Sequence, residues 1–428
     1  MSDGAMDTNW GIQVTTLDNG LRVVTDSMAG VETVSLGVWV GVGTRDEAPE
    51  VNGVAHLVEH MLFKGTPKRD AYQISQQIED VGGHLNAYTT REHTAYYGKV
   101  LKEDAGLALD IVADMVQHAS LDADELAKER TVVLQEIGQA EDTPDDIIFD
   151  HFQATAFPGQ ALGRPVLGLP EIVERLSRDD LTAYVQGHYS GPAMVVAASG
   201  RIEHARMVDM AAEMFGALPE HRDWTQEKAS YQGGDFRDER DLEQTHVVLG
   251  FEAVGVHHED NYATQVLSTL LGGGMSSRLF QEVREKRGLV YSIYSFASHF
   301  AETGLFGIYA GTGPEQVAEL VPVVCGEVAN LVGSIREDEV ARARAQLKSS
   351  LVMALESSMA RCEQVGQQML IHGRPVPVAE MLARVNAVDV DAVERCARRL
   401  LDSVPVVTAL GPLAGLELYD RILARLGH

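Results

Sequence analysis

Apolar and polar positions along the chain form two alternating kinds of pattern. Residues 33–44 form a run rich in β-branched side chains, which is typical of a buried strand. Residues 52–63 and 71–82 carry apolar residues at helical spacing, and residues 84–101 return to strand character. Residues 122–142 predict a long helix with its opening Asp as the N-cap. Strands and helices mixed in this way predict α/β or α+β layers.

The order of elements restarts after a polar stretch near mid-chain. Residues 219–240 contain almost no aliphatic side chains and include a Gly pair, so they predict a linker. After it, residues 243–256 resemble the strand at 33–44, and residues 261–296 repeat the order helix, helix, glycine, strand. In this alignment Gly288 takes the place of Gly83. We therefore predict an internal duplication.

Length and charge narrow the class of protein. A chain of 428 residues favours two or more domains. It carries 63 acidic and 35 basic residues, a net charge of −28, which argues against nucleic acid or an anionic membrane as partner. A basic or unfolded peptide would suit this charge, although such an excess more often serves only to keep a protein dissolved.

Cysteine usage and the N-terminus indicate a compartment. Cys325, Cys362 and Cys396 are an odd, sparse set without a Cys-x-x-Cys pair, which fits buried thiols in a reducing environment. Residues 1–14 lack the pattern of a secretory signal, and no apolar run is long enough to cross a bilayer. We expect a cytoplasmic protein.

One predicted helix carries polar groups that the fold does not require. When Ala55 is aligned with Ala263, the second copy keeps the apolar frame of this helix but not its two imidazoles and carboxylate. The frame alone is therefore enough for the fold, and the first copy's polar side chains need another reason. The three aligned pairs are His56 with Thr264, Glu59 with Leu267, and His60 with Ser268.

Helical spacing predicts a metal site at these positions. Positions i, i+3 and i+4 share one helix face, so His56 and His60 can direct two nitrogens at one ion, with Glu59 beside them. A catalytic zinc site usually has three protein ligands, and Glu129 and Glu136, two turns apart on the long helix, could each supply the third. His-x-x-Glu-His is the inverted zinc-peptidase motif, with Glu as general base. The alternative is a pair of ordinary histidines with satisfied hydrogen bonds.

Three segments together resemble a known family. HLVEHMLFKGT, GGHLNAYTTREHTAYY and ERTVVLQEIGQAEDTPDD are similar to the pitrilysin/insulinase-type zinc peptidases, especially the short branch that contains the mitochondrial processing peptidase β-subunit and its bacterial relatives. The family's third ligand lies 76 positions after the second His, which here is Glu136. The resemblance implies one Zn²⁺ held by His56, His60 and Glu136, with Glu59 as base and Glu129 orienting a ligand.

The resemblance extends over nearly the whole chain. It implies an α+β fold of two homologous domains, each an antiparallel-rich sheet covered by helices, that face each other around a chamber. We expect a zinc-binding catalytic domain over residues 1–218 and a linker over residues 219–240. The homologous domain over residues 241–428 is expected to lack metal ligands. By the same resemblance Arg284 and Tyr291 hold substrate from the second domain, and Asn86 and Ala87 pair with the substrate backbone along a strand edge.

The expected activity is that of a zinc endopeptidase acting on short or unfolded peptides, with a weak tilt towards basic ones. The bacterial relatives imply a homodimer. Two alternatives stay open: a structural subunit without activity, against which the complete motif argues, and a catalytic subunit that needs an unlike partner. The positions of His84, His93 and His118 remain unexplained by the motif.

Overall fold

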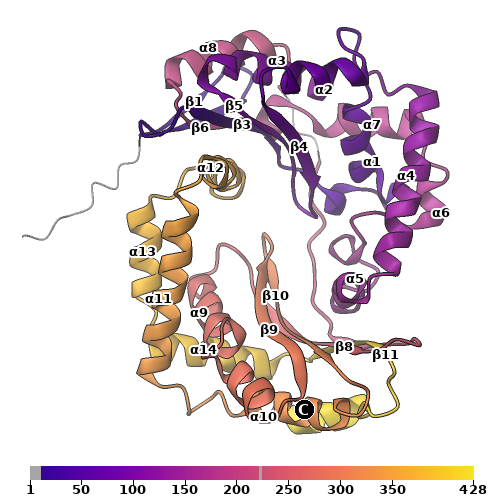
Figure 1. Cartoon of the computed structure of the whole chain (residues 1–428), viewed down its shortest axis with the longest axis vertical. Coiled ribbons are helices and arrows are strands. Elements are labelled where there is room, and N and C mark those ends of the chain that lie inside the picture. The colour runs from indigo at the N-terminus through magenta and orange to yellow at the C-terminus, as the bar shows by residue number, and fades with distance from the viewer. Residues whose placement is uncertain (1–10, 221–223) are drawn as a thin grey trace, which may run out of the picture. The chain divides into compact units, whose positions relative to one another are not determined.

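The computed structural model describes residues 11–220 and 224–428, and these divide into two compact units (Figure 1). The first unit contains the segments up to Ile137, Pro165–Glu227 and Val352–Glu380, and the second contains Gly138–Arg164, Lys228–Leu351 and Met381–His428. The N-terminal stretch on which the absence of a signal peptide rests lies largely outside the described residues. Within 11–220 and 224–428, no helix combines the length and apolar character that crossing a bilayer requires.

The first unit is built on a six-stranded mixed sheet of order β1-β2-β6-β3-β5-β4. Only β2 and β6 pair in parallel, so the sheet is mostly antiparallel. Its elements are β1 (Ile12–Thr16), β2 (Arg22–Ser27), β3 (Thr33–Val40), α1 (Val54–Leu62), α2 (Ala71–Glu79), β4 (His84–Thr89), β5 (Thr94–Leu101), α3 (Ala105–His118), α4 (Ala123–Glu141), α6 (Pro170–Val173), α7 (Arg178–His188), β6 (Met194–Gly200), α8 (His204–Phe215) and α12 (Ser358–His372).

The second unit repeats the plan with a five-stranded sheet of order β7-β11-β8-β10-β9, in which only β7 and β11 are parallel. The α+β prediction with two antiparallel-rich sheets is confirmed. Its elements are α5 (Pro144–Ala156), β7 (Gly234–Glu239), β8 (Thr245–Val254), α9 (Asn261–Gly272), the π-helix η6 (Phe280–Glu285), β9 (Val290–His299), β10 (Thr303–Thr312), α10 (Val317–Ala329), α11 (Glu337–Ala354), α13 (Val378–Asn386), α14 (Val390–Asp402), β11 (Val406–Gly411) and α15 (Tyr419–Leu426).

Each unit contains one helix whose residues come from the other half of the sequence. In the first unit, α12 packs on the sheet face of Val24, Trp39 and Val195, opposite the face that α1 and α3 cover. In the second unit, α5 packs on β8 and β11 (Figure 1). Both helices bury apolar residues that would otherwise meet water, which is the main driving force for packing. The predicted division into residues 1–218 and 241–428 therefore follows the repeat and does not coincide with the compact units.

Two details differ from the sequence-based prediction. Gly234–Glu239 lies in the expected linker but forms β7, because its backbone pairs with β11 in a parallel ladder. The glycine equivalent to Gly288 is Gly82 rather than Gly83, since both precede their strands by two residues and both adopt a positive φ, +63° and +68°. A positive φ is the conformation for which glycine is best suited.

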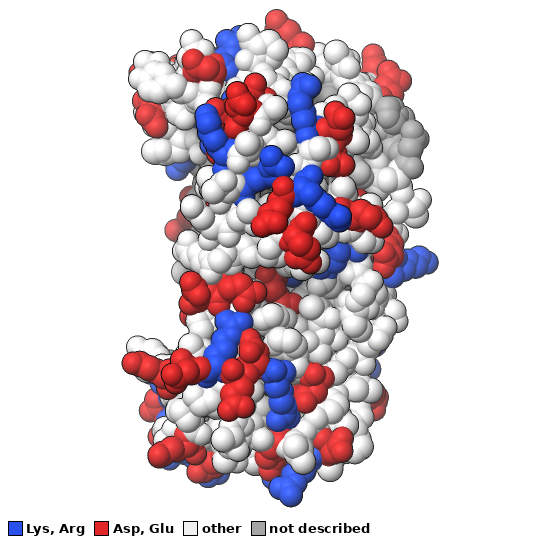
Figure 2. Space-filling model, turned by 90° about the vertical axis from the view of Figure 1, so that its right-hand side faces the viewer, with Lys and Arg blue, Asp and Glu red and all other residues white. Residues whose placement is uncertain are grey.

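Surface charge shows no single block on the face that Figure 2 draws. Acidic and basic side chains there lie next to one another in several places, with wide uncharged areas between them. The excess of acidic residues is therefore spread out on this face, as in a chain whose charge serves general solvation. The three cysteines are buried and unpaired, as predicted.

Candidate metal centre

The first copy's polar residues lie on α1, whose N-terminus is fixed by a buried carboxylate. Glu47, only 4% exposed, accepts hydrogen bonds from the backbone N–H groups of Gly53 and Ala55 at 2.9 and 2.8 Å. A carboxylate at this end of a helix also meets the positive end of the helix dipole. Gly53 has φ +98°, and a Cβ there would lie 2.9 Å from the backbone of Gly168. Local packing therefore sets where α1 begins.

Three potential ligands converge next to α1. Nε2 of His60 lies 3.4 Å from Oε2 of Glu136, and Nε2 of His56 lies 3.8 Å from the same oxygen. Donor atoms of the three residues all lie within 4.8 Å of one another. Tetrahedral donors bound at about 2.0–2.1 Å to zinc are roughly 3.4 Å apart, so this set of two imidazoles and one carboxylate fits a zinc ion.

Glu129 approaches the other nitrogen of His60. Its Oε2 lies 3.0 Å from Nδ1, and its Oε1 lies 2.7 Å from Nζ of Lys64. Glu129 is buried, whereas the side chain of Glu136 is 39% exposed. The seven-residue spacing on α4 thus places the two carboxylates on opposite sides of one imidazole. A carboxylate on the outer nitrogen fixes the tautomer that leaves Nε2 free for a metal.

Glu59 points to the edge strand β4. The hydroxyl of Thr89 donates a hydrogen bond to Oε2 of Glu59. Burial raises the pKa of Glu59, the hydrogen bond from Thr89 and the nearby His60 oppose this rise, and the charge of Glu136 adds to it. Burial also lowers the pKa of His56 to about 4, with a contribution from His60, so its imidazole is neutral at pH 7 and can act as a ligand.

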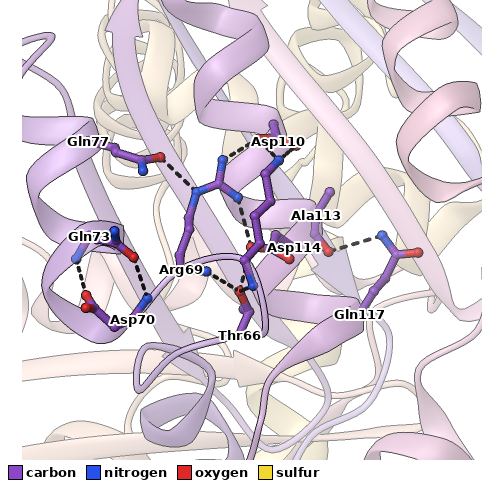
Figure 3. A network of polar contacts seen from close by, with 10 residues as sticks. Thr66, Arg69, Asp70, Gln73, Gln77, Asp110, Ala113, Asp114 and Gln117 are labelled. Atoms are coloured by element: carbon purple, nitrogen blue, oxygen red, sulfur yellow. Dashed lines mark hydrogen bonds and ion pairs between the residues drawn. The ribbon is translucent and has the colours of Figure 1, made fainter.

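The loop after α1 is tied to α3. Figure 3 shows Arg69 reaching Gln77, Asp110 and Asp114, while the hydroxyl of Thr66 donates to Asp114. Arg69 is 4% and Asp114 7% exposed, so this is a buried ion pair, and the other two guanidinium nitrogens of Arg69 donate to Gln77 and Asp110. The network holds the loop that carries Lys64 at the end of α1.

The remaining predicted residues lie on two strands and a π-helix. Asn86 and Ala87 are on β4, which pairs only with β5 and forms one edge of its sheet; the Ala87 N–H donates to Oδ1 of Asn86 at 2.9 Å. In the second unit, the guanidinium carbon of Arg284 lies 5.6 Å from the ring centre of Tyr291, which is 80% exposed.

The sequence-based prediction missed Thr89 and Lys64. A possible signal for Lys64 was its position four residues after His60, one helical turn further on. Thr89 offered no such signal, because only the pairing of β4 with β5 and its packing against α1 bring it to Glu59. His93 is also placed by the fold: it lies next to Tyr88, with 5.6 Å between ring centres.

An inverted zinc-peptidase motif with a Glu from a second helix defines a class of metal-dependent peptidase. Known proteins agree with it. The family model described as "Insulinase (Peptidase family M16)" matches residues 22–169, and the "Peptidase M16 inactive domain" matches residues 175–347. A Streptomyces coelicolor protein described as an uncharacterized zinc protease is 42% identical over 427 residues, covering 96% of this chain and 92% of its own.

Other relatives point the same way. The probable mitochondrial-processing peptidase subunit beta of Arabidopsis thaliana is 37% identical over 429 residues, covering 96% of this chain and 81% of its own. The chain therefore belongs to the insulinase family of peptidases, M16. Two solved structures share its fold: complex III2 from Candida albicans (TM-score 0.87, 24% identity, 97% of this chain and 100% of that one) and a Helicobacter pylori protease (0.86, 21%, 94% and 99%).

Proposed function

We propose that the protein is a zinc-dependent endopeptidase that hydrolyses short or unfolded peptides. The observation that carries this proposal is the convergence of donor atoms from His56, His60 and Glu136 within 4.8 Å. Glu59 lies on α1, the helix that also carries the two histidines. Membership of the insulinase family and the relatives described as zinc proteases support it.

In this proposal the two imidazoles and Glu136 hold the ion. A zinc ion held there would supply Lewis-acid chemistry, because it would polarise the scissile carbonyl and bring the pKa of water down to about 7. Glu59 accepts the proton that the attacking water loses and gives it to the leaving amine. Burial raises the pKa of Glu59, which makes the carboxylate a stronger base, and the Thr89 hydroxyl fixes the direction of the carboxylate. Glu129 orients His60 through Nδ1.

The edge of β4 would hold the substrate. An extended peptide adds to such an edge by backbone hydrogen bonds, with Asn86 and Ala87 as the proposed contacts. A segment inside a folded domain cannot offer its backbone in this way, so the substrate must be short or locally unfolded. We also propose a preference for basic peptides, because the chain carries a net charge of −28. Equal cleavage rates for matched acidic and basic peptides would reject that preference.

Arg284 and Tyr291 are the proposed substrate-holding pair of the second unit. An aromatic side chain that is 80% exposed contributes little to a core, and the guanidinium stacked near its ring keeps both groups in a fixed relation. A hydroxyl and a guanidinium suit carbonyl oxygens of a bound peptide. Changing Tyr291 to Phe should lower kcat/KM without changing zinc content.

A second candidate is a catalytic subunit that needs an unlike partner. One observation favours it: the Arabidopsis relative is named as a subunit. We prefer a homodimer that is active by itself, because this chain carries both the metal-ligand motif and the Arg284–Tyr291 pair.

The test compares the purified protein with its Glu59→Gln variant for zinc content and for cleavage of a mixed pool of unfolded peptides. Glu79→Gln, on the exposed face of α2, is the matched control. We expect one zinc per chain in all three proteins and cleavage by the wild type and the control only. Zinc without cleavage in the wild type would favour the subunit candidate. Absence of zinc from all three proteins would reject the proposal that this protein is a zinc-dependent peptidase.

A further inference from the structure

The edge strand β4 is held on both faces. Consecutive residues in a strand point to opposite sides of a sheet. Thr89 reaches Glu59 of α1 on one side. Its neighbour Tyr88 reaches α12 on the other, where its hydroxyl donates to Oε1 of Glu363 at 3.1 Å and accepts from Nε2 of Gln367 at 3.1 Å. The strand next to the proposed base is thus connected to a helix 275 residues further along the chain.

The Tyr88 contact is built into the interior. Burial raises the pKa of Tyr88 to about 12, so the hydroxyl keeps its proton and remains a donor at pH 7. His93 follows in the turn after β4; its Nε2 lies 3.4 Å from both the Tyr88 hydroxyl and Nε2 of Gln367. Burial lowers the pKa of His93 to about 4, which leaves the ring neutral at pH 7. These groups therefore hold one hydrogen-bonded arrangement near neutral pH.

The helix that supplies Glu363 and Gln367 is itself fixed firmly to the sheet. Nε of Arg361 donates to Asp26 at 2.6 Å, and both residues are 3–4% exposed. Ser358 and Ser35 hydroxyls lie 3.0 Å apart. Gly366 lies against the ring of Trp39, because a Cβ there would come within 2.6 Å of it. Together these contacts make α12 a rigid support for β4.

We propose that Tyr88 is a positioning residue, which Glu363 and Gln367 hold against α12 so that β4 keeps Thr89 on Glu59 and keeps Asn86 and Ala87 in register for a substrate backbone. This inference rests on the proposed peptidase function for its kinetic consequence. It also means that the second half of the sequence supports the active strand of the first unit through a helix that carries no metal ligand.

The test uses the zinc-loaded full chain and two readouts. The first is amide hydrogen exchange across residues 84–90, and the second is kcat/KM for an unfolded peptide. In Tyr88→Phe, exchange should rise about tenfold, and kcat/KM should fall about tenfold because the base is displaced, with zinc content unchanged. Glu363→Ala should match it. Glu363→Gln keeps an acceptor oxygen and should stay within about twofold of wild type.

Tyr72→Phe is the matched control, since this Tyr is 71% exposed on α2 and should leave both readouts unchanged. The double variant Tyr88→Phe/Glu363→Ala should be no worse than either single change, because both remove the same contact. If Tyr88→Phe shows the same amide exchange and the same kcat/KM as the wild type, the proposal is overturned, whether or not the variant is less stable. If the wild type cleaves nothing, the proposed function fails, while the exchange measurement still decides the role of Tyr88.

Discussion

Nδ1 of His60 lies 3.0 Å from Oε2 of Glu129, while Nε2 of the same ring lies 3.4 Å from Glu136. One imidazole therefore joins a buried carboxylate to the proposed metal position. The two acidic residues, which lie on one side of α4, thus approach different nitrogens of the same ring.

Replacing Glu129 should weaken metal binding without removing a ligand. Glu129→Gln keeps the shape but loses the charge that orients His60, so the dissociation constant for zinc should rise roughly 10–100-fold. Competition with a metal chelator measures this constant. Glu125→Gln, one turn earlier on α4, is the control, because Glu125 contacts only Lys128 among the described ion pairs. Equal zinc affinity in Glu129→Gln and wild type would rule out the orienting role.

The packing of α12 on the sheet of the first unit should depend on the buried ion pair between Arg361 and Asp26. Arg361→Met leaves Asp26 as an uncompensated buried charge, which should cost about 3–5 kcal/mol of unfolding free energy in urea. Burial already raises the pKa of Asp26 although Arg361 opposes this, so the pair is not strongly stabilising by itself. Asp26→Leu/Arg361→Met should consequently lose less than the single change. Lys102→Met, at a pair whose side chains are 44% and 67% exposed, is the control and should unfold like wild type.

Gly366 should tolerate no side chain. In Gly366→Ala the new Cβ would lie 2.6 Å from the Trp39 ring, so α12 must shift, at a cost of about 1–3 kcal/mol. Gly326→Ala provides the contrast, since no atom lies within 4 Å of a Cβ there and α10 should gain roughly 0.5–1 kcal/mol. Thermal unfolding of both variants checks the prediction, and it fails if the two changes shift stability equally.

Stability should fall as the pH falls below about 6.5, in part because of His93. Its pKa is about 4 in the folded protein because burial disfavours the charged ring, whereas an unfolded His titrates near 6.5. The unfolded chain therefore binds the proton first, and this contribution to stability, complete above pH 6.5, is lost between pH 6.5 and 4. His93→Gln should flatten the dependence of melting temperature on pH over that window. The exposed His118→Gln should leave the slope as in wild type.

Local patterns made the convergence of the candidate metal ligands predictable. The i, i+3, i+4 spacing of His56, Glu59 and His60 and the seven-residue spacing of Glu129 and Glu136 depend only on helix geometry, and the structure brings these side chains together. The two-sheet plan followed from the repeat. The placement of α5 in the second unit and of α12 in the first could not be predicted, because contacts such as Asp26–Arg361 join residues 335 positions apart and leave no periodic signal. Strand β7 was missed because its mostly polar residues show no apolar alternation, whereas its place in the sheet comes from backbone pairing with β11.

Removal of zinc followed by its return shows whether the protein is a zinc-dependent peptidase. The protein is treated with a chelator, assayed on unfolded peptides, and titrated with Zn²⁺ alongside Glu136→Gln. We predict that activity disappears with the metal, returns in proportion to added zinc and levels off at one ion per chain, while Glu136→Gln binds zinc far more weakly. Activity that survives complete loss of zinc, or full zinc affinity in Glu136→Gln, would contradict it.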